Sequence, residues 1–319
     1  MGAIDHHLTA DELYTAIESA ERESASAETQ HGHCIAFVFT HPIVADDGHV
    51  FFGPLVRAAR SRATTLGCDV LVCAPSQDHW LEAELVERCV EHGANGLVVL
   101  GGADGNPDIL RSRWPGLPVV FVEYDTVGSR SAHVGIDNET AMGEIVLHLA
   151  ETGHSRIAHI TGMLDSRVGA ERMIAYRATM ERLGYEIRPD YVQTGDFQLL
   201  SAYESAKRLL ALDDPPDAIA CAADVAAVGA IKAIQEAGLR VPEDIAVTGF
   251  DDAEWAGQLT PTLTTVRQPA KEMGRAAIES VVAMVEDPAL HPPSVLLPGE
   301  LVVRESCGAK PADVLAGNR

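Results

Sequence analysis

The sequence predicts an α/β protein with two lobes, each a doubly wound parallel sheet. Two observations lead to this fold class. From Cys34 onward, short and continuously apolar runs alternate with longer amphipathic stretches, which is the pattern of parallel strands covered by helices on both faces. The number of strand–helix units is also too large for one small sheet, so two lobes are expected.

The apolar runs are the predicted strands. Their length, their β-branched residues and their continuous apolarity are typical of strands buried on both faces. In chain order they cover 35–39, 70–73, 96–100, 119–122, 157–161, 218–222 and 245–250.

Amphipathic stretches between these runs are the predicted helices. They cover 53–66, 81–92, 139–151, 168–183, 202–210 and 225–237. Four of them are followed by a glycine, which is the expected residue just past a helix C-terminus because it adopts a left-handed conformation without strain. These glycines are Gly67, Gly93, Gly184 and Gly238.

Residues 1–33 differ from the rest of the chain. They contain seven acidic residues and a single basic one, Arg22. The segment 8–23 predicts one short helix, with Thr9 as its N-cap and Glu12 completing a capping box, and 24–30 is a polar linker.

Length and charge narrow the function classes. The chain has 319 residues, which suits two domains, and 24 basic against 47 acidic residues give a net charge of −23. Such a chain is repelled by nucleic acid phosphates unless a local basic patch compensates. The start of the chain lacks a signal peptide pattern, and the sequence has no apolar run long enough for a membrane helix, so a cytoplasmic protein without membrane contact is expected.

Motifs for enzymes, metals and cofactors are weak. The six cysteines form no C-x-x-C motif and the histidines have no zinc-site spacing, so free thiols and no metal are expected. The glycine-rich segment 96–105 fits neither a dinucleotide nor a P-loop fingerprint, and no G-x-S-x-G elbow occurs. The sequence therefore predicts neither an enzyme nor a resident cofactor.

Polar residues that follow the predicted strands indicate a ligand site. Ligands of doubly wound folds bind beyond the carboxyl ends of the strands, and Glu123, Asp224 and Asp251 follow three of the runs, with Arg172 one helix beyond a fourth. Each has a structural alternative, since Asp224 could cap its helix and Asp251 with Asp252 could form a turn. Together, however, these carboxylates and the arginine favour a polar ligand.

The C-terminal half carries several longer phrases in a fixed order. They are ETGHSRIAHI at 151–160, VPEDIAV at 241–247, GFDD at 249–252, TPTLTTVRQP at 260–269 and ELVVRES at 300–306. Their order and spacing resemble the effector-binding core of the LacI/GalR family of transcriptional regulators, over about residues 34–306.

This resemblance implies the type I periplasmic-binding-protein fold, in which three segments cross between two lobes. It places lobe 1 at 34–136 plus 268–292 and lobe 2 at 137–267 plus 293–308, leaving 309–319 as a tail. The extended segments 135–138 and 264–268 are suited to cross between lobes.

Site residues carry over from the resemblance one at a time. Arg172 resembles the family's effector-contacting arginine, whose fork can bracket adjacent hydroxyls. Phe197 resembles the aromatic residue that stacks on the ligand, and Asp251 the carboxylate that accepts from its hydroxyls. Three further matches are Asp224 of the family's Asn-Asp pair, Glu123 in lobe 1 and Gln268 near the hinge. Phe51 and Phe52 resemble the family's aromatic pair at the start of the first helix, and core packing is the alternative for these two residues.

The sequence departs from the family pattern in two places. Ala223 stands where the family usually has asparagine, so a common sugar contact is missing and the ligand could be smaller or less hydroxylated. The family's helix-turn-helix is not found in residues 1–33. We therefore expect specific DNA binding only through a missing N-terminal domain or a partner chain.

The sequence thus predicts the small-molecule sensor of a LacI/GalR-type regulator. The ligand is expected to be a sugar or a derivative, the lobes to close on it, and the protein to be a homodimer. A stand-alone solute-binding protein of a transport system is the alternative, and an enzyme on the same scaffold is a third.

Overall fold

The computed structural model describes residues 32–39, 51–74, 83–101, 108–123, 130–291 and 293–309. The predicted helix at 8–23 and nearly all of the predicted tail at 309–319 lie outside the described residues. The following description concerns the compact unit that begins at His33.

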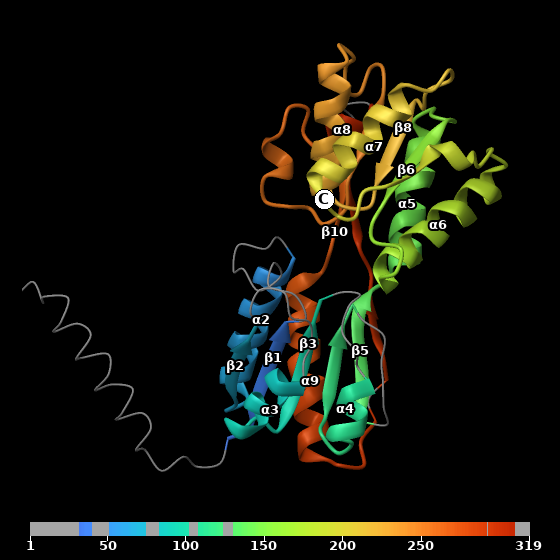
Figure 1. Ribbon diagram of the computed structural model, residues 1–319. Helices are drawn as coiled ribbons and strands as arrows, with labels where there is room; N and C mark the ends of the chain where they lie inside the picture. Colours follow the sequence, from blue (N-terminus) through green and yellow to red (C-terminus); the bar gives the residue numbers. More distant parts are fainter. Residues whose placement is uncertain are drawn as a thin grey trace, which may run out of the picture. The chain divides into compact units, whose positions relative to one another are not determined.

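A six-stranded parallel sheet forms the first half of this unit (Figure 1). Its strand order is β11-β5-β4-β3-β1-β2, so β1 lies between β3 and the edge strand β2 although it comes first in the chain. The four strands predicted here are confirmed within one residue. The strands are β1 (Cys34–Phe39), β2 (Asp69–Cys73), β3 (Gly96–Leu100), β4 (Val119–Val122), β5 (Ser131–Ile136) and β11 (Val295–Leu297).

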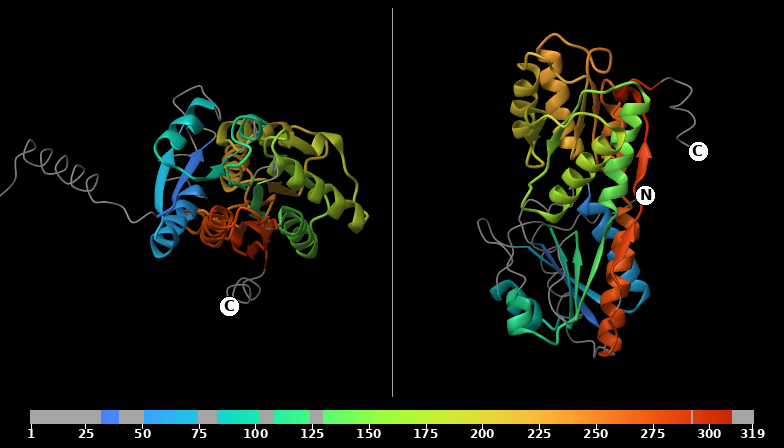
Figure 2. Two further views of the ribbon diagram at one scale, coloured as in Figure 1. Left: turned by 90° about the horizontal axis from the view of Figure 1, so that it is seen from below. Right: turned by 90° about the vertical axis from the view of Figure 1, so that its right-hand side faces the viewer.

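Helices cover both faces of this sheet, as Figure 2 shows from two sides. On one face, α2 (Phe52–Thr65) and α9 (Ala270–Glu286) share a hydrophobic cluster with Ile35 and Phe37 of β1. On the other face, α3 (Ala83–Glu91) and α4 (Asp108–Arg113) pack on the intervening side chains, such as Ala36. Alternate residues of one strand thus enter two separate cores, which is why the strands are apolar throughout.

A four-stranded parallel sheet forms the second half, in the order β7-β6-β8-β9. One face packs on α5 and α6 and the other on α7 and α8. The predicted strands are confirmed, although β9 is shorter than the predicted 245–250. The elements are α5 (Asn138–Glu151), β6 (Ile157–Thr161), α6 (Arg167–Leu183), β7 (Val192–Thr194), α7 (Leu199–Leu210), β8 (Ala218–Cys221), α8 (Asp224–Glu236) and β9 (Ala246–Thr248).

Three segments connect the two sheets, as expected for this fold class. The first leads from β5 into α5, the second from β9 through β10 (Thr265–Arg267) to α9, and the third from β11 through β12 (Glu300–Val302) to the short helix η4 (Glu305–Cys307). They lie against one another, because a Cβ added to Gly299 would meet Val266 at 2.7 Å and Ile136 at 3.0 Å. The predicted crossing segments 135–138 and 264–268 are two of these three.

Two sequence-based expectations are wrong. Residues 293–308 were assigned to the second lobe, yet Val295–Leu297 pair with β5 and extend the six-stranded sheet. The predicted strand at 70–73 was expected to be buried on both faces, but β2 is an edge strand and Val72 is 49% exposed. Hydrophobic pattern does not reveal which strand ends at a sheet edge, because that depends on pairing between distant segments.

The glycines predicted to end helices are confirmed by their backbone conformation. Gly67, Gly93, Gly184 and Gly238 have φ values of 69°, 89°, 72° and 78°. The six cysteines are free thiols, four of them buried, while Cys34 and Cys73 are partly exposed.

Candidate functional site

The candidate site is built around the N-terminal part of α6, which follows β6. Ser166 caps this helix, its Oγ accepting a hydrogen bond from the Gly169 amide at 3.1 Å. A Cβ on Gly169 would lie 2.0 Å from the Met163 carbonyl oxygen, so only glycine permits this tight start. The second turn of the helix then presents Arg172 to the carboxyl ends of the neighbouring strands.

Arg172 is buried and tightly held. Its Nε donates to Asn138 Oδ1 at 2.8 Å and its Nη1 to the Ala222 carbonyl oxygen at 2.7 Å. The guanidinium lies 3.6 Å from the centre of the Phe250 ring and 5.9 Å from that of Phe197. Among the described residues, its Nη2 makes no hydrogen bond, which leaves that donor for a ligand.

Carboxylates surround this guanidinium. Burial lowers the pKa of Arg172, and the negative charges of Asp251, Glu123, Glu171 and Asp224 act against that change. The predicted gathering of Arg172, Asp224 and Asp251 in one place is therefore what the structure contains, with Glu123 beside them.

Asp251 occupies a strained turn just beyond β9. Its φ is 125°, in the region that favours glycine, and the next residue, Asp252, has a φ of 53°. The Gln268 amide donates to Asp251 Oδ1 at 2.6 Å, so the predicted hinge glutamine orients the predicted carboxylate. Burial raises the pKa of Asp251, and the nearby Arg172 opposes the rise.

Both carboxylate oxygens of Asp224 accept hydrogen bonds from within the protein. Its Oδ2 accepts from the Ala253 amide at 2.8 Å and its Oδ1 from the Thr265 hydroxyl at 2.5 Å. The side chain does not cap α8, because Ala223 occupies the N-cap position. The two oxygens thus join Ala253, in the turn that follows Asp251, to Thr265 of β10, so Asp224 holds this turn against that strand.

Glu123 joins the six-stranded sheet to the site. It follows β4 with a φ of 57°, is 9% exposed, and accepts from the Ile136 amide at 2.6 Å and from Asn138 Nδ2 at 3.4 Å. Burial raises its pKa to about 7, against the opposing influence of the Ile136 amide and Arg172.

Asn138 is a site residue that sequence reasoning missed. It is the first residue of α5, is 2% exposed, and contacts Arg172, Glu123 and Glu171, the last at 2.9 Å. The sequence offered one signal for it: Asn138 is a polar residue at the point where a predicted crossing segment meets a predicted helix. Phe250 was also missed, although it lies within the recognised GFDD phrase.

Phe197 lies beside Arg172 and Gly162. Its φ is 55°, and its ring is so close to Gly162 that a Cβ there would come within 2.0 Å of a ring carbon. Gly162 therefore makes room for the ring, which is partly exposed and available to a ligand.

Phe51 and Phe52 are placed differently. Each is 8% exposed, their rings pack edge to face at 4.9 Å, and both belong to the hydrophobic cluster beneath α2. Phe52 also packs against Phe39 at 6.2 Å. These contacts support core packing, which was the alternative considered for this pair.

Within the described residues, no group of three or more His, Cys, Asp or Glu side chains could hold a metal ion. None of the helices described is both long enough and apolar enough to cross a membrane.

The fold is that of a periplasmic-binding-protein-like domain, and residues 146–307 match the family described as "Periplasmic binding protein-like domain". The chain is 30% identical over 295 residues to the ribose operon repressor of Escherichia coli (strain K12), covering 91% of this chain and 89% of that protein. It is also 30% identical over 250 residues to the HTH-type transcriptional repressor PurR of Aliivibrio salmonicida, covering 77% and 74%.

Two solved structures of transcriptional regulators superpose on this chain over most of its length. A regulatory protein of the LacI family from Chloroflexus aggregans superposes with a TM-score of 0.76 at 28% identity, over 86% of this chain and 98% of that one. The transcriptional regulator CelR–cellobiose complex superposes with a TM-score of 0.77 at 26% identity, over 95% and 92%. The chain belongs to the LacI family of transcriptional regulators, and the described unit is the effector-sensing core of that family.

Membership in this family does not favour the alternative of a stand-alone transport protein, since the relatives are transcriptional repressors. The expectation about DNA binding concerns residues that lie outside the structural description, so it stays a prediction.

Proposed function

We propose that the chain senses an uncharged, hydroxyl-rich small molecule, a sugar or a close derivative, and does so as a regulator rather than as an enzyme. The observation that carries this proposal is the buried guanidinium of Arg172, held by Asn138 and Ala222 with Nη2 left over, beside the strained Asp251. A hydroxyl group can accept from the arginine and donate to the carboxylate at once, which neither a purely anionic nor an apolar ligand can do.

Local charge supports an uncharged ligand. Four acidic side chains already surround the single guanidinium of Arg172, so an anionic ligand would have to compete with them for its charge. Phe197 adds a partly exposed aromatic ring next to the arginine, suited to the apolar C–H face of a sugar ring. The names of two similar proteins, a ribose operon repressor and a complex with cellobiose, are consistent with this ligand class.

Arg172, Asp251 and Phe197 are the proposed ligand contacts, and Glu123, Asp224 and Gln268 support them. Ala223 is buried in the hydrophobic cluster beneath α8 and contributes no polar group. The hydroxyl contacts therefore come from Arg172 and Asp251, and a small sugar such as a pentose fits better than a larger sugar that needs more polar contacts.

We propose that ligand binding shifts the protein between two arrangements of its two halves, one open and one closed. A ligand that contacts residues on both sheets binds the closed arrangement more tightly and shifts the population toward it. We further propose that the protein acts in the cytoplasm as a homodimer, and that operator contact requires a DNA-binding segment on this chain or on a partner.

Calorimetric titration of the full chain with D-ribose, cellobiose and ribose 5-phosphate tests the proposal. We expect one of the neutral sugars to bind. Ribose 5-phosphate, added as a competitor, should displace that sugar from the Arg172 site at least about tenfold less effectively than ribose does, a difference of about 1.4 kcal/mol or more that reflects repulsion and lost hydrogen bonding. Arg172→Gln and Asp251→Asn should each weaken sugar binding by about 1–3 kcal/mol.

Lys207→Gln, at an exposed position on α7, is the matched control and should leave sugar binding unchanged. Displacement of the bound sugar by ribose 5-phosphate at lower concentrations than by ribose, or unchanged sugar binding by the Arg172 variant, would contradict the proposed role of this site.

A further inference from the structure

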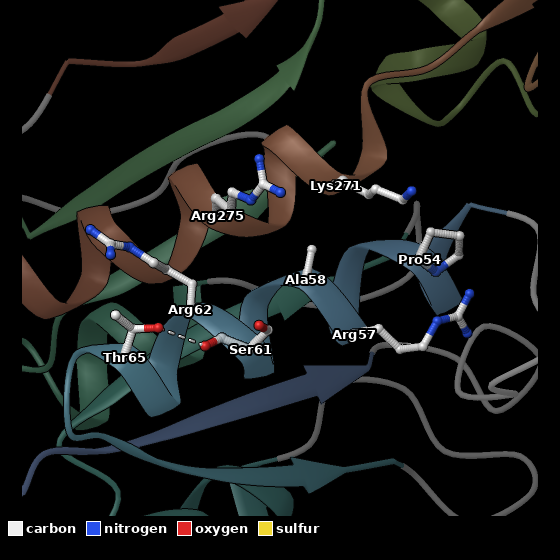
Figure 3. Close-up of a pocket in the computed structure, with 8 residues that line it drawn as sticks. All are labelled: Pro54, Arg57, Ala58, Ser61, Arg62, Thr65, Lys271 and Arg275. Carbon is white, nitrogen blue, oxygen red and sulfur yellow. Dashed lines mark hydrogen bonds between the residues drawn. The ribbon is translucent and has the colours of Figure 1, made fainter.

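A groove on the helices that cover one face of the six-stranded sheet is separate from the site described above. It runs between α2 and α9 and has a volume of about 380 Å³, and the described residues that line it belong to these two helices (Figure 3). This volume lies at the lower end of the range found for small-molecule pockets. The groove shares no residue with the arginine–carboxylate site.

Close packing of the two helices makes the floor of the groove rigid. A Cβ added to Gly274 of α9 would lie 2.2 Å from the Leu55 carbonyl oxygen of α2, so the backbones approach as closely as sterics permit. Ala58, which lies at the centre of the lining in Figure 3, adds a small side chain there. Larger residues at these positions would fill the space between the helices.

The lining is basic in a protein that is strongly acidic. Of the described residues that line the groove, four are cationic and none is a carboxylate, whereas the chain as a whole carries a net charge of −23. The cations are Arg57 and Arg62 on α2 and Lys271 and Arg275 on α9.

Two of the cations pair with carboxylates outside the lining. Arg62 Nε lies 2.6 Å from Glu279 Oε1, and Arg275 Nη1 lies 3.8 Å from Glu272 Oε1, a contact between half-exposed side chains. Lys271 makes no ion pair within the part of the chain that the structure describes. Exposed pairs of this kind contribute little and exchange readily for a better partner, so an anion can recruit Arg275 together with Lys271.

The dipoles of helices α2 and α9 also favour an anion in this groove. Pro54 and Lys271 belong to the first turns of α2 and α9 and lie at the same end of the groove (Figure 3). Both helices are long, and the N-terminal end of a helix carries a partial positive charge that favours anions.

We propose that this groove binds the phosphate group of a small phosphorylated molecule, as a second ligand distinct from the neutral effector. Lys271 supplies a compact charge, the planar fork of Arg275 can bind two phosphate oxygens, and the Ser61 hydroxyl can donate a further hydrogen bond. A small dianion fits better than a nucleic acid because an extended polyanion would also meet the acidic remainder of the surface, whereas charges beyond about 8 Å from a small ligand are screened at physiological salt.

Thermal unfolding of the full chain in increasing inorganic phosphate tests this site, with ionic strength held constant by sodium chloride. A ligand that binds only the folded protein raises the unfolding midpoint in a saturable way. We expect such a rise for the wild type, and the double variant Lys271→Gln with Arg275→Gln should weaken the apparent affinity for phosphate by about tenfold or more.

The double variant Lys207→Gln with Lys232→Gln is the matched control, because it removes the same charge from exposed positions on α7 and α8. It should respond to phosphate as the wild type does. A wild type without a saturable rise, or an equal rise in the groove variant, would overturn the proposal. Two further probes are ribose 5-phosphate and a labelled DNA duplex. If the duplex binds at about 0.15 M salt and neither inorganic phosphate nor ribose 5-phosphate raises the unfolding midpoint, the groove is assigned to nucleic acid instead.

Discussion

A guanidinium is costly to bury, and Arg172 is stabilised in the interior by three kinds of contact. Asn138 and the Ala222 carbonyl accept its hydrogen bonds, the Phe250 ring covers one face, and surrounding carboxylates balance its charge. Because every one of these partners is itself anchored, the arginine is held in one orientation before a ligand arrives, which lowers the entropy lost on binding.

Residue-level reasoning found this arginine but not its main partner. Arg172, Asp251 and Gln268 stand in recognisable phrases, whereas Asn138 is a single polar residue at a helix start. Its importance comes from the crossing segment that brings it to Glu123 and Arg172 at once. No local pattern encodes that meeting of two sheets.

Glu123 should make folding stability depend on pH. Burial raises its pKa from 4.5 to about 7, so between these values the folded protein binds more protons at this carboxyl than the unfolded chain does. Its contribution to the free energy of unfolding is therefore fully present below about pH 4.5 and is lost as the pH rises to about 7, a total of about 3 kcal/mol at about 1.4 kcal/mol for each tenfold change in proton affinity.

Chemical denaturation of the wild type and of Glu123→Gln between about pH 5 and pH 8 measures this effect. The variant keeps an acceptor for the Ile136 amide but does not titrate, so the difference between the two proteins isolates Glu123 from the other carboxyls. A wild-type stability advantage that stays constant, or grows, with rising pH would be inconsistent with a proton held at this residue.

At the level of elements, helix ends were predicted well and helix α9 was not predicted at all. Glycines at helix C-termini act locally, so Gly67, Gly93, Gly184 and Gly238 could be assigned from the sequence. The helix Ala270–Glu286 follows Pro269, and its apolar residues alternate with charged ones around Gly274. That glycine weakens helix propensity, and its reason is tertiary, since α2 leaves no room for a side chain there.

Gly274→Ala should consequently destabilise the protein even though alanine is the better helix former. The added methyl group would lie 2.2 Å from the Leu55 carbonyl oxygen, so α2 and α9 must separate, and such overpacking costs about 1–3 kcal/mol. Urea denaturation gives the change in the free energy of unfolding.

Gly116→Ala provides the contrast, because a Cβ there would meet nothing within 4 Å and the backbone is not left-handed. That substitution should be neutral or stabilising by up to about 1 kcal/mol. Equal effects of the two substitutions would show that the α2–α9 contact is looser than described.

For the whole molecule, the three crossing segments connect the sensor site to both sheets. Glu123 extends from the six-stranded sheet, while Arg172 and Asp251 extend from the four-stranded one, and Asn138 at a crossing contacts two of these three. On the neighbouring crossing, Asp252 accepts hydrogen bonds from Arg267 at 2.7 Å and Arg304 at 2.6 Å. A ligand bound at Arg172 and Asp251 therefore acts on residues that join the two halves.

Small-angle X-ray scattering should show a smaller radius of gyration when the wild type is saturated with the neutral sugar that binds best in the titrations. The physical reason is that a ligand touching both halves stabilises the closed arrangement. Arg172→Gln at the same sugar concentration should keep the radius of the free protein. An unchanged radius for the saturated wild type would mean that the pocket is rigid and preformed.

The sequence by itself determined the fold class, the order of most strands and helices, and six of the residues that gather near the site. Strand burial, helix capping and the phrases that resemble the LacI/GalR family can all be recognised over short distances along the chain. Tertiary structure alone decided the rest. It placed β11 in the six-stranded sheet and β2 at its edge, turned Asp224 into a support for the Asp251 loop, buried Phe51 and Phe52 in the core, and set four basic side chains around one groove. Each of these outcomes depends on which distant segments meet, and pairing between distant segments leaves no periodic trace in the residues of either one.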